Sequence, residues 1–520
     1  MNRKVLRALI SVTDKNGVVD FARGLTDRGV EIIASGGTAR AIRDAGIEVT
    51  GISDLTGFPE CMDGRVKTLH PKVHGGILAD RTKKDHLEQA AELGIGLIDL
   101  VAVNLYRFRE AASNPSLSEL DIVEQIDIGG PTLIRSAAKN HDSVSIVTDP
   151  SDYTDILEEM DANEGCVTDQ TRRKLSSKAF HHTASYDSAI SAWFDGIEAP
   201  GEMPDQRISV YRKSRSLRYG ENPHQKAALY IEESPVGSFH LFEQHQGKEL
   251  SFNNIQDMWA AYLLARDLGN NACAILKHMN PCGAAVCDTV GESFIRARKT
   301  DPVSAFGSVI SVNGIVDEEL AVASKEGFVE VILARGFTDG ALEALKKKKN
   351  LRLITLPEQE WEREISGRVS REAGPMLLVQ DRDTGFPEIE SLDIVTSRKP
   401  SPEEEKAMRL SWKVVKHMKS NGIVICDSLG TVGVGAGQMS RVDSCRIAVE
   451  KARIENMTIE GATAGSDAFF PFPDGVETLV EAGVRCIIQP GGSIRDDEVI
   501  AAAEKLGITM AITGRRHFRH

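Results

Sequence analysis

The chain has 520 residues, of which 41% are hydrophobic and 27% are charged, and its formal net charge is -14 at pH 7. This length predicts about two to four domains with packed cores. The acidic balance argues against general binding to nucleic acids or anionic membranes, which needs a basic face, but it is compatible with local basic pockets for small phosphates.

The eight cysteines are scattered along the chain, and no two of them form a CxxC pair. This pattern is typical of thiols in a reducing compartment and indicates neither a disulfide framework nor a structural zinc site. No window approaches the roughly 20 apolar residues of a membrane span, and no signal-length apolar run develops before Ser11. We therefore expect a cytoplasmic protein without a membrane partner.

The N-terminal part alternates predicted strands and helices. Residues 6–12 and 30–34 have the composition of buried strands, and helical spacing follows each of them. A β-α-β-α order predicts a parallel sheet. Apolar runs at 97–105 and 143–148 predict further strands, and residues 168–193 a long helix.

Small polar turns follow the first two predicted strands. Residues 35–38 have the sequence Ser-Gly-Gly-Thr and open a helix, so their backbone N–H groups predict an anion site. Taken alone, this motif fits an ordinary tight turn equally well. Arg65 suits bidentate phosphate recognition and Lys67 supplies a point charge, although a solvated basic loop would have the same composition.

Two other polar segments of this part were candidates for chemistry. His70 and His74 have the spacing of a metal pair, but Pro71 between them argues against a regular helix of ligands and no HExxH motif follows. We predict no metal there. Asp127 precedes a Gly-Gly turn that offers both a carboxylate and the N–H donors that an oxyanion needs.

The domain boundaries follow from Pro- and Gly-rich segments. Residues 198–206 predict a linker, so we expect one domain over residues 1–197 and another over residues 207–520. Within the second domain, scattered Pro, Gly and charged residues at 357–405 predict a crossing between two lobes.

Lys277 and His278 follow residues 272–276, an apolar run that predicts a buried strand. Pro281 and Gly283 predict that the chain leaves this strand within a few residues, so the pair is expected at a strand end, where α/β folds collect active-site residues. The unperturbed pKa of histidine lies near physiological pH, and a neighbouring cation favours its neutral, proton-accepting form. For an isolated pair, a core histidine beside a surface lysine is the commoner arrangement.

Two features close to the C-terminus complete the list of candidates. Residues 431–441 are glycine-rich, which lets a backbone approach a ligand, but they lack the GxGxxG spacing of a dinucleotide site. The last four residues, 517–520, contain one aromatic ring and two imidazoles, which is unusual for a frayed end. We predict that this tail docks.

Twelve motifs along the chain together resemble one family, the bifunctional purine-biosynthesis enzymes that combine AICAR (aminoimidazole carboxamide ribonucleotide) transformylase with IMP cyclohydrolase. They stand in order between positions 11 and 520 and are SVTDK, SGGT, GRVKTLHP, NLY, DIGG, AAKNH, RYGENPHQ, KHMNPCG, DPVSAFG, VGAGQMSR, SDAFFPFPD and RRHFRH. One such motif can arise by chance, whereas twelve in register identify a family. Arg107 departs from the pattern, because the family usually has proline after NLY.

The resemblance implies an α/β protein with a methylglyoxal-synthase-like parallel-sheet domain followed by two cytidine-deaminase-like α/β lobes. The C-terminal domain would transfer a formyl group from 10-formyltetrahydrofolate to the amine of AICAR. The N-terminal domain would close the product, formyl-AICAR, to IMP with loss of water. The folate would be a co-substrate, with no tightly bound cofactor and no metal, and the protein a homodimer that shares its formyl-transfer site across the interface.

The resemblance also assigns residues to formyl transfer. His278 would be the general base that takes a proton as the amine attacks, and Lys277 would keep His278 neutral and stabilise the tetrahedral intermediate. The residues expected to contact the nucleotide or the folate are Arg218, Tyr219, Asn254, Gly307, Glu330, Asn421, Arg441, Val442, Phe469, Asp474, Ser493, Ile494 and Arg516.

For ring closure, the resemblance implies proton transfer by Lys67, Tyr106, Asp127 and Lys139, with the amides of Ile128 and Gly129 as oxyanion donors. The residues expected around the ribotide and its phosphate are Ser11, Thr13, Asp14, Lys15, Ser35, Gly36, Gly37, Thr38, Arg65, Thr68 and Asn104.

Two rival functions stay open to the sequence. A deaminase-like fold suggests zinc-dependent deamination, but that chemistry needs HxE and PCxxC motifs, and here Pro281-Cys282 is followed by Gly-Ala-Ala, which lacks the second thiolate. The N-terminal domain could instead be a phosphate-ligand sensor without catalysis. Lys139, Tyr106 and Asp127 favour catalysis, and turnover of formyl-AICAR by residues 1–197 alone would separate the two.

Overall fold

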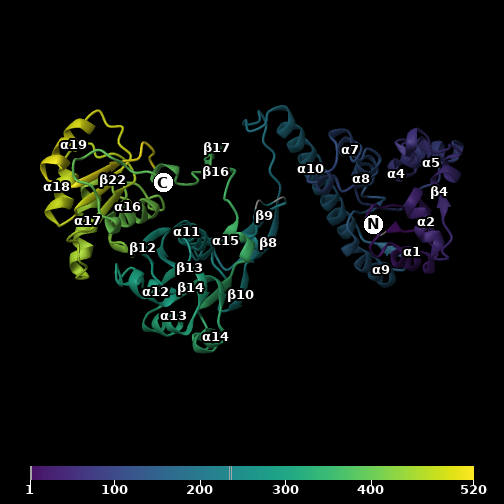
Figure 1. Ribbon diagram of the computed structural model, residues 1–520. Coiled ribbons are helices and arrows are strands. Elements are labelled where there is room, and N and C mark those ends of the chain that lie inside the picture. Colours follow the sequence, from purple (N-terminus) through teal and green to yellow (C-terminus); the bar gives the residue numbers. More distant parts are fainter. Residues whose placement is uncertain (1–2, 234, 236) are drawn as a thin grey trace. The chain divides into compact units, whose positions relative to one another are not determined.

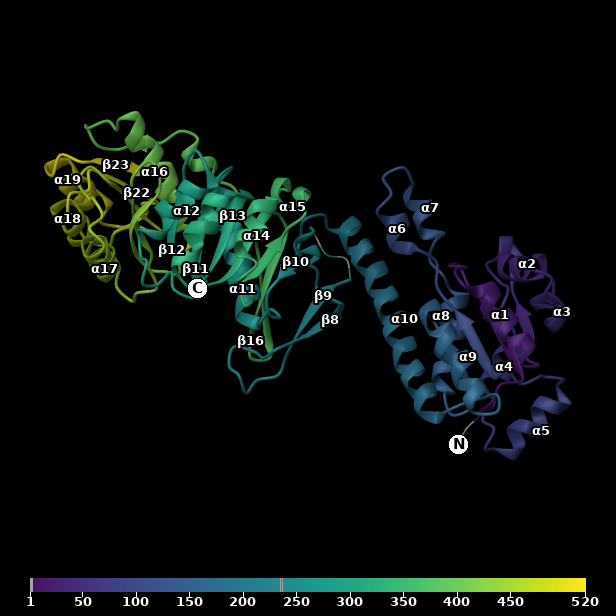
Figure 2. The same ribbon diagram turned by 90° about the horizontal axis from the view of Figure 1, so that it is seen from below.

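The computed structural model describes residues 3–233, 235 and 237–520, and the chain divides into two compact units, Met1–Val210 and Tyr211–His520 (Figure 1, Figure 2). Within the described ranges, no helix is long and apolar enough to cross a membrane. The two units are described separately below.

The first unit is built on a five-stranded sheet in the order β4-β3-β2-β5-β6, and every neighbouring pair in it is parallel. Its strands are β2 (Arg7–Ser11), β3 (Glu31–Ala34), β4 (Thr50–Gly51), β5 (Leu100–Val103) and β6 (Ser145–Val147). β5 and β6 are buried throughout, and β2 and β3 along most of their length, which explains the apolar runs of these four strands in the sequence. The chain adds β3 and β4 on one side of β2 and then β5 and β6 on the other, so the order reverses between β2 and β5. This confirms the predicted parallel sheet.

Ten α-helices, two 3₁₀ turns and one small strand pair complete the first unit among its described residues. A short antiparallel pair joins β1 (Arg3–Lys4) to β7 (Cys166–Val167). The helices are α1 (Val18–Asp27), α2 (Gly36–Asp44), α3 (Ile52–Thr56), α4 (Pro71–Leu78), α5 (Lys84–Glu92), α6 (Phe108–Ala112), α7 (Glu119–Val123), α8 (Gly129–Lys139), α9 (Tyr153–Ala162) and α10 (Asp169–Glu198), with the 3₁₀ turns Met62–Gly64 and Pro150–Asp152. The side chain of Thr168 caps α10, which packs against α8 (Figure 2).

The second unit contains two six-stranded mixed sheets with the same topology. Their orders are β10-β15-β14-β13-β11-β12 and β18-β23-β22-β21-β19-β20, each with an antiparallel hairpin at one edge and an antiparallel strand at the other. The first sheet comprises β10 (Glu243–Gln246), β11 (Ala272–Lys277), β12 (Asn280–Val286), β13 (Ser308–Val316), β14 (Val329–Phe337) and β15 (Arg352–Thr355). The second comprises β18 (Asp393–Ile394), β19 (Ile423–Cys426), β20 (Thr431–Gly435), β21 (Thr463–Ser466), β22 (Cys486–Gln489) and β23 (Thr509–Ile512). These sheets confirm the two predicted α/β lobes.

One buried apolar cluster joins the two lobes. It contains side chains of α11 (Phe252–Leu268), α16 (Pro402–Val415) and both sheets, whereas each outer face has a cluster of its own. The remaining helices are α12 (Val290–Arg298), α13 (Glu318–Ala323), α14 (Asp339–Leu345), α15 (Glu358–Glu362), α17 (Arg441–Ile454), α18 (Asp474–Glu481) and α19 (Asp496–Lys505), with 3₁₀ turns at Phe239–Leu241, Ser324–Glu326 and Pro387–Ile389. In Figure 1 the first lobe is teal and the second is green to yellow.

The lobes also meet along their edge strands, β12 and β20. A bridge pairs Ala285 with Gly430, and the N–H of Ala284 donates to Thr431 Oγ1 at 2.9 Å. A Cβ at Gly430 would lie 2.7 Å from the carbonyl oxygen of Ala284, so only glycine permits this approach without a shift.

One local prediction was wrong. Pro281 and Gly283 do not end the structure after β11 but lie inside β12, which turns back along β11 as a hairpin. Pro281 is tolerated because β12 is an edge strand and the register shifts at that point. The pair Lys277–His278 nevertheless lies at the end of a strand, as predicted.

The predicted crossing between the lobes contains structure of its own. It includes α15, the hairpin of β16 (Arg368–Ala373) and β17 (Met376–Asp381), and β18. A second exposed hairpin pairs β8 (Tyr211–Leu217) with β9 (Ala227–Glu232).

Candidate active sites

A cavity of about 600 Å³ opens in the first unit at the carboxyl ends of β2, β3 and β5, where the strand order reverses. This is the position at which parallel α/β sheets bind ligands, because the loops on either side of the reversal diverge. Every residue predicted for ring closure lines this cavity except Asp14 and Lys139. The tertiary structure therefore gathers five separate sequence motifs at one edge of the sheet.

The loop after β2 is held by Asn104, which follows β5. Asn104 Oδ1 accepts hydrogen bonds from the N–H groups of Thr13 at 2.6 Å and Asp14 at 2.9 Å, and Ser11 Oγ lies 2.7 Å from Ser35 Oγ. Ser35 precedes the first turn of α2, whose unpaired N–H groups line the same cavity. The arrangement is a preformed cradle for an anion such as a phosphate.

Two basic side chains of the cavity are paired with carboxylates that the motifs did not indicate. Lys67 Nζ lies 2.8 Å from Glu60 Oε1, and the Arg65 guanidinium contacts the carboxylate of Glu124. These pairs neutralise the two cations. Glu60 and Glu124 are ordinary acidic residues in the sequence, and only their position beside the cavity distinguishes them.

Asp127 is a partly buried carboxyl two residues before the start of α8. Burial raises its pKa, against the opposing effect of a hydrogen bond from the Gly130 N–H to Oδ1 at 2.8 Å. Its own N–H donates to Tyr186 Oη at 2.8 Å, and Tyr186 donates to the carbonyl of Gln125 at 3.0 Å. Burial raises the pKa of Tyr186 to about 12, so the phenol stays a neutral donor. Sequence reasoning missed Tyr186, because it lies on α10 and carries no local motif.

Two predicted residues are not at the cavity. Lys139 is exposed at the last position of α8, whereas the cavity is at the first, roughly 15 Å away along an 11-residue helix. Asp14 is not among the lining residues, and its Oδ2 lies 3.9 Å from Arg107 Nη2. Tyr106 lines the cavity although Arg107 replaces the family's proline.

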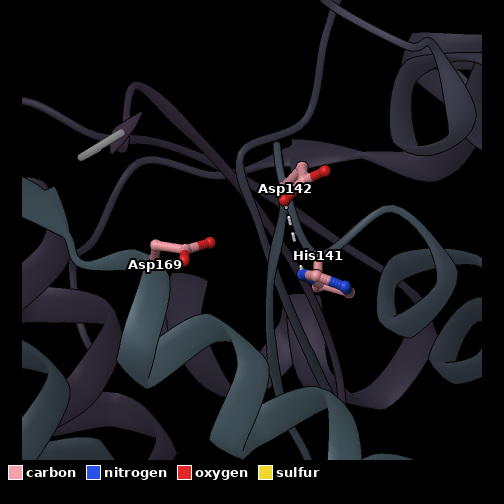
Figure 3. Close-up of side chains that lie close together, drawn as sticks. All are labelled: His141, Asp142 and Asp169. Atoms are coloured by element: carbon pink, nitrogen blue, oxygen red, sulfur yellow. Dashed lines mark ion pairs between the residues drawn. The ribbon is translucent and has the colours of Figure 1, made fainter.

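Figure 3 shows three residues of the first unit with candidate metal-ligand atoms within 4.8 Å of one another, His141, Asp142 and Asp169. His141 Nδ1 lies 3.7 Å from Asp142 Oδ1, and Asp169 pairs with Arg173 Nε at 3.1 Å and Arg172 Nη2 at 3.7 Å. Because two guanidinium groups already neutralise Asp169, we assign no metal here.

The residues predicted for formyl transfer form two clusters in the second unit. In the first lobe, His278 and Met279 make a left-handed turn between β11 and β12, with φ of 53° and 61°. Lys277 Nζ donates to the carbonyl of Phe306 at 2.7 Å, which fixes the loop that contains Gly307. The other predicted residues of this lobe are near one another: Asn254 bonds Glu330, Glu330 pairs with Arg352, and Arg218 stacks on Tyr219.

The second cluster lines a cavity of about 480 Å³ in the second lobe, and its predicted members are Asn421, Arg441, Val442, Phe469 and Asp474. Arg441 is buried, and its guanidinium donates to Asp467 Oδ1 at 2.6 Å and Asn421 Oδ1 at 2.8 Å. Phe518 also lines this cavity, and the Arg516 guanidinium lies 4.8 Å from its ring centre. Ser493 and Ile494 are not among the lining residues, and Ile494 is fully exposed.

A hydrogen bond from a backbone N–H to a side chain links the two clusters. The N–H of Lys419 donates to Asn280 Oδ1 at 2.9 Å, which places the hairpin of His278 next to the segment of Asn421. Lys277 and His278 do not line the second-lobe cavity.

The C-terminal tail is docked, as predicted. The buried His517 ring has Nδ1 2.6 Å from Asp383 Oδ2 and Nε2 3.0 Å from Glu388 Oε1. Both ring nitrogens donate when the imidazole is charged. Burial acts to raise the pKa of Asp383, but the hydrogen bond from His517 and the positive charges around the carboxylate, among them Lys416 and Arg515, together outweigh burial, and the pKa is lowered. This contact holds Phe518 at the cavity.

Comparisons with known proteins match this architecture. A family model described as the AICARFT/IMPCHase bienzyme matches residues 137–451, and one described as an MGS-like domain matches residues 17–132. The bifunctional purine biosynthesis proteins PurH of Bacillus cytotoxicus and Halalkalibacterium halodurans are 48% and 49% identical over 516 and 519 residues, which is 99% of this chain and 99% of each relative. The chain belongs to the PurH family.

A third PurH relative, from Bacillus mycoides, is 48% identical over 516 residues. A solved chain titled "Crystal structure of ForH" is 38% identical and covers 36% of this chain and 99% of its own, with a TM-score of 0.33. As a PurH protein, the chain is an enzyme of purine biosynthesis with AICAR formyltransferase and IMP cyclohydrolase activities. The family uses formyltetrahydrofolate as a substrate.

Proposed function

We propose that ring closure takes place in the cavity of the first unit and formyl transfer at the two clusters of the second. The domains of residues 1–197 and 207–520 would then each carry one activity. The observation that supports this division best is that all the predicted ring-closure residues except Asp14 and Lys139 line one cavity within Met1–Val210, whereas Lys277 and His278 lie on a hairpin within Tyr211–His520.

For ring closure, the phosphate of formyl-AICAR would bind the cradle at the start of α2. The carboxamide nitrogen attacks the formyl carbon, a C–N bond forms, and the nitrogen loses a proton to Asp127. The former formyl oxygen would take up two protons, one from Tyr106 and the one that Asp127 has accepted, and leave as water, while the formamide nitrogen returns its own proton to Tyr106 and the C=N bond of the product forms. Lys67 would supply positive charge beside the departing oxygen. Lys139 has no role in this scheme, because it lies at the far end of α8.

For formyl transfer, the amine of AICAR attacks the formyl carbon of 10-formyltetrahydrofolate. His278 takes the proton from the amine and delivers it to the departing N10 of the folate, so that one C–N bond forms and another breaks. The ammonium of Lys277 stabilises the oxyanion of the tetrahedral intermediate. The nucleotide would contact the first-lobe cluster and the folate the second-lobe cavity, and the folate would bind as a dissociable co-substrate.

We further propose that two copies of the chain complete the formyl-transfer site. Ile494, which the resemblance assigns to this site, is fully exposed. Met439 and Phe472 line the second-lobe cavity but are themselves 99% and 48% exposed. Apolar groups gathered at a site and left in solvent favour a partner surface.

Two reciprocal variants test the division of labour. We expect His278→Ala to lower formyl transfer by about 1,000-fold and to leave cyclisation unchanged, because general acid–base groups contribute about 100- to 10,000-fold. Lys67→Met should do the converse. Each activity is measured separately, with AICAR and 10-formyltetrahydrofolate or with formyl-AICAR as substrate. Equal loss of both activities in a folded variant would contradict the proposal.

A further inference from the structure

The first turns of α11 contact two separate parts of the first-lobe cluster. Asn254 Nδ2 donates to Glu330 Oε2 on β14 at 2.8 Å, and Asp257 Oδ1 accepts from the N–H of Met279 at 2.7 Å. Residues three apart share one face of a helix, so both contacts come from the same side of α11. Asp257 belongs to none of the motifs that the sequence indicated.

The turn that Asp257 contacts is unfavourable for its residues. His278 and Met279 both have positive φ, which residues with a Cβ rarely adopt and which persists only where the surroundings impose it. In such a turn, successive N–H groups point to the same side and form a small anion-binding concavity. The Asp257 carboxylate occupies that position, with hydrogen bonds from the backbone of both residues.

The ionised form of the Asp257 carboxylate is unfavourable at this position. Burial raises the pKa of Asp257, the hydrogen bond from Met279 and the charge of His278 act to lower it, and the nearby Glu330 raises it further. Glu330 in turn has Arg352 Nη1 at 3.7 Å. Asp257 is a partly buried acid with unfavourable solvation, and its carboxylate is directed at one strained turn, which indicates a local task there.

We propose that Asp257 is a positioning residue for formyl transfer, whose carboxylate holds the left-handed turn of His278 and Met279 and thereby orients the His278 imidazole. This inference rests on the proposed role of His278. Asn254 on the same face of α11 donates a hydrogen bond to Glu330 on β14. The helix therefore fixes the position of the hairpin relative to β14.

The test compares Asp257→Ala with Asp257→Asn in the full-length protein. Asp257→Ala removes the acceptor, and we expect kcat for formyl transfer to fall about 100-fold, as a misplacement of about 1 Å can cause. The KM for AICAR should stay within about twofold, because Asp257 acts through His278 and not on the nucleotide. Asp257→Asn keeps an oxygen acceptor for the Met279 N–H and should retain kcat within about tenfold of the wild type.

Two controls accompany these variants. Asp288→Asn removes an exposed carboxylate near the other end of the same hairpin and should change kcat by less than about twofold. Cyclisation, measured on the same preparations, should be unchanged in all three variants.

A double-mutant cycle with His278→Ala separates this inference from the proposed function. If Asp257 acts through His278, Asp257→Ala should cost less than about threefold in the His278→Ala background. A further fall of about 100-fold in kcat when Asp257→Ala is added to His278→Ala would overturn the inference. An unchanged kcat in Asp257→Ala, with His278→Ala inactive, would overturn it too. Formyl transfer that survives His278→Ala would overturn the proposed function itself. If Asp257→Ala unfolds or also loses cyclisation, the Asp257→Asn variant decides between the outcomes. A fall in its kcat for formyl transfer as large as that of His278→Ala would overturn the inference, and a retained kcat supports it.

Discussion

The two candidate sites differ in whether the predicted residues line one cavity or are divided between two places. In the first unit, loops after β2, β3 and β5 and the start of α8 surround one cavity, because a parallel sheet brings the carboxyl ends of strands distant in sequence to one edge. In the second unit, the predicted residues are divided between two lobes, with His278 on one and Arg441 on the other. The parallel sheet therefore brings the residues of the first site together at one edge, whereas the two similar lobes of the second unit each contain only part of the second site.

The difference extends to the surfaces around the sites. Two of the basic groups of the first cavity, Lys67 and Arg65, are neutralised by Glu60 and Glu124 of the same unit. Around the second-lobe cavity, apolar side chains such as Met439 remain in solvent. The first site is therefore expected to work in one copy of the chain, and the second to need another surface.

The sharpest test of the first site is Asp127→Asn. We expect cyclisation to fall by about 100-fold or more with formyl transfer unchanged, because the proton acceptor is lost. Since burial raises the pKa of Asp127 in the folded protein, its ionised form at neutral pH lowers stability, and this cost disappears as the pH falls through that raised pKa. The variant should therefore unfold at a higher temperature than the wild type at pH 7, with a difference that shrinks in acid. A lower unfolding temperature at pH 7 would contradict this account.

Dilution separates the two sites directly. If two copies complete only the second, the specific activity of formyl transfer should fall at least about tenfold once the protein is diluted below the dissociation constant of the dimer. Cyclisation should not change over the same range. Analytical ultracentrifugation supplies the dissociation constant. An equal loss of both activities on dilution would contradict the proposal that only the second site needs two copies.

The tail offers a smaller perturbation of the second site alone. His517→Leu leaves Asp383 and Glu388 without the imidazole between them and should release Phe518 from the cavity. We expect the KM for 10-formyltetrahydrofolate to rise about tenfold, the equivalent of about 1.4 kcal/mol of binding energy, with cyclisation unchanged. An unchanged KM would show that the docked tail does not contribute to the folate site.

The smallest effect is expected at Glu60. Its pair with Lys67 is about half exposed, and such pairs contribute at most about 1 kcal/mol. Glu60→Gln frees the ammonium for the substrate and should lower the KM for formyl-AICAR up to about fivefold. Steady-state kinetics checks this, with Glu88→Gln on the exposed face of α5 as the control. A raised KM would indicate that Glu60 contacts the substrate.

Much of the fold followed from local patterns. Continuous apolar runs separated by helical spacing predicted the parallel sheet, since buried strands in such sheets have no polar face. The hairpin of Pro281 and Gly283 was missed, because these residues normally interrupt strands and only the edge position of β12 makes them acceptable.

The sequence by itself determined the buried strands of the parallel sheet and predicted which residues carry the chemistry, because short motifs such as Ser-Gly-Gly-Thr and Lys-His specify donors, acceptors and charges within a few positions. Only the tertiary structure decided which of these residues line the same cavity or contact one another. It brought Tyr186 to Asp127 and Asp257 to the turn of His278, and it separated Lys139 from the cavity by the length of one helix. Contacts between residues that are distant along the chain depend on how helices and strands pack, and no local pattern records that packing.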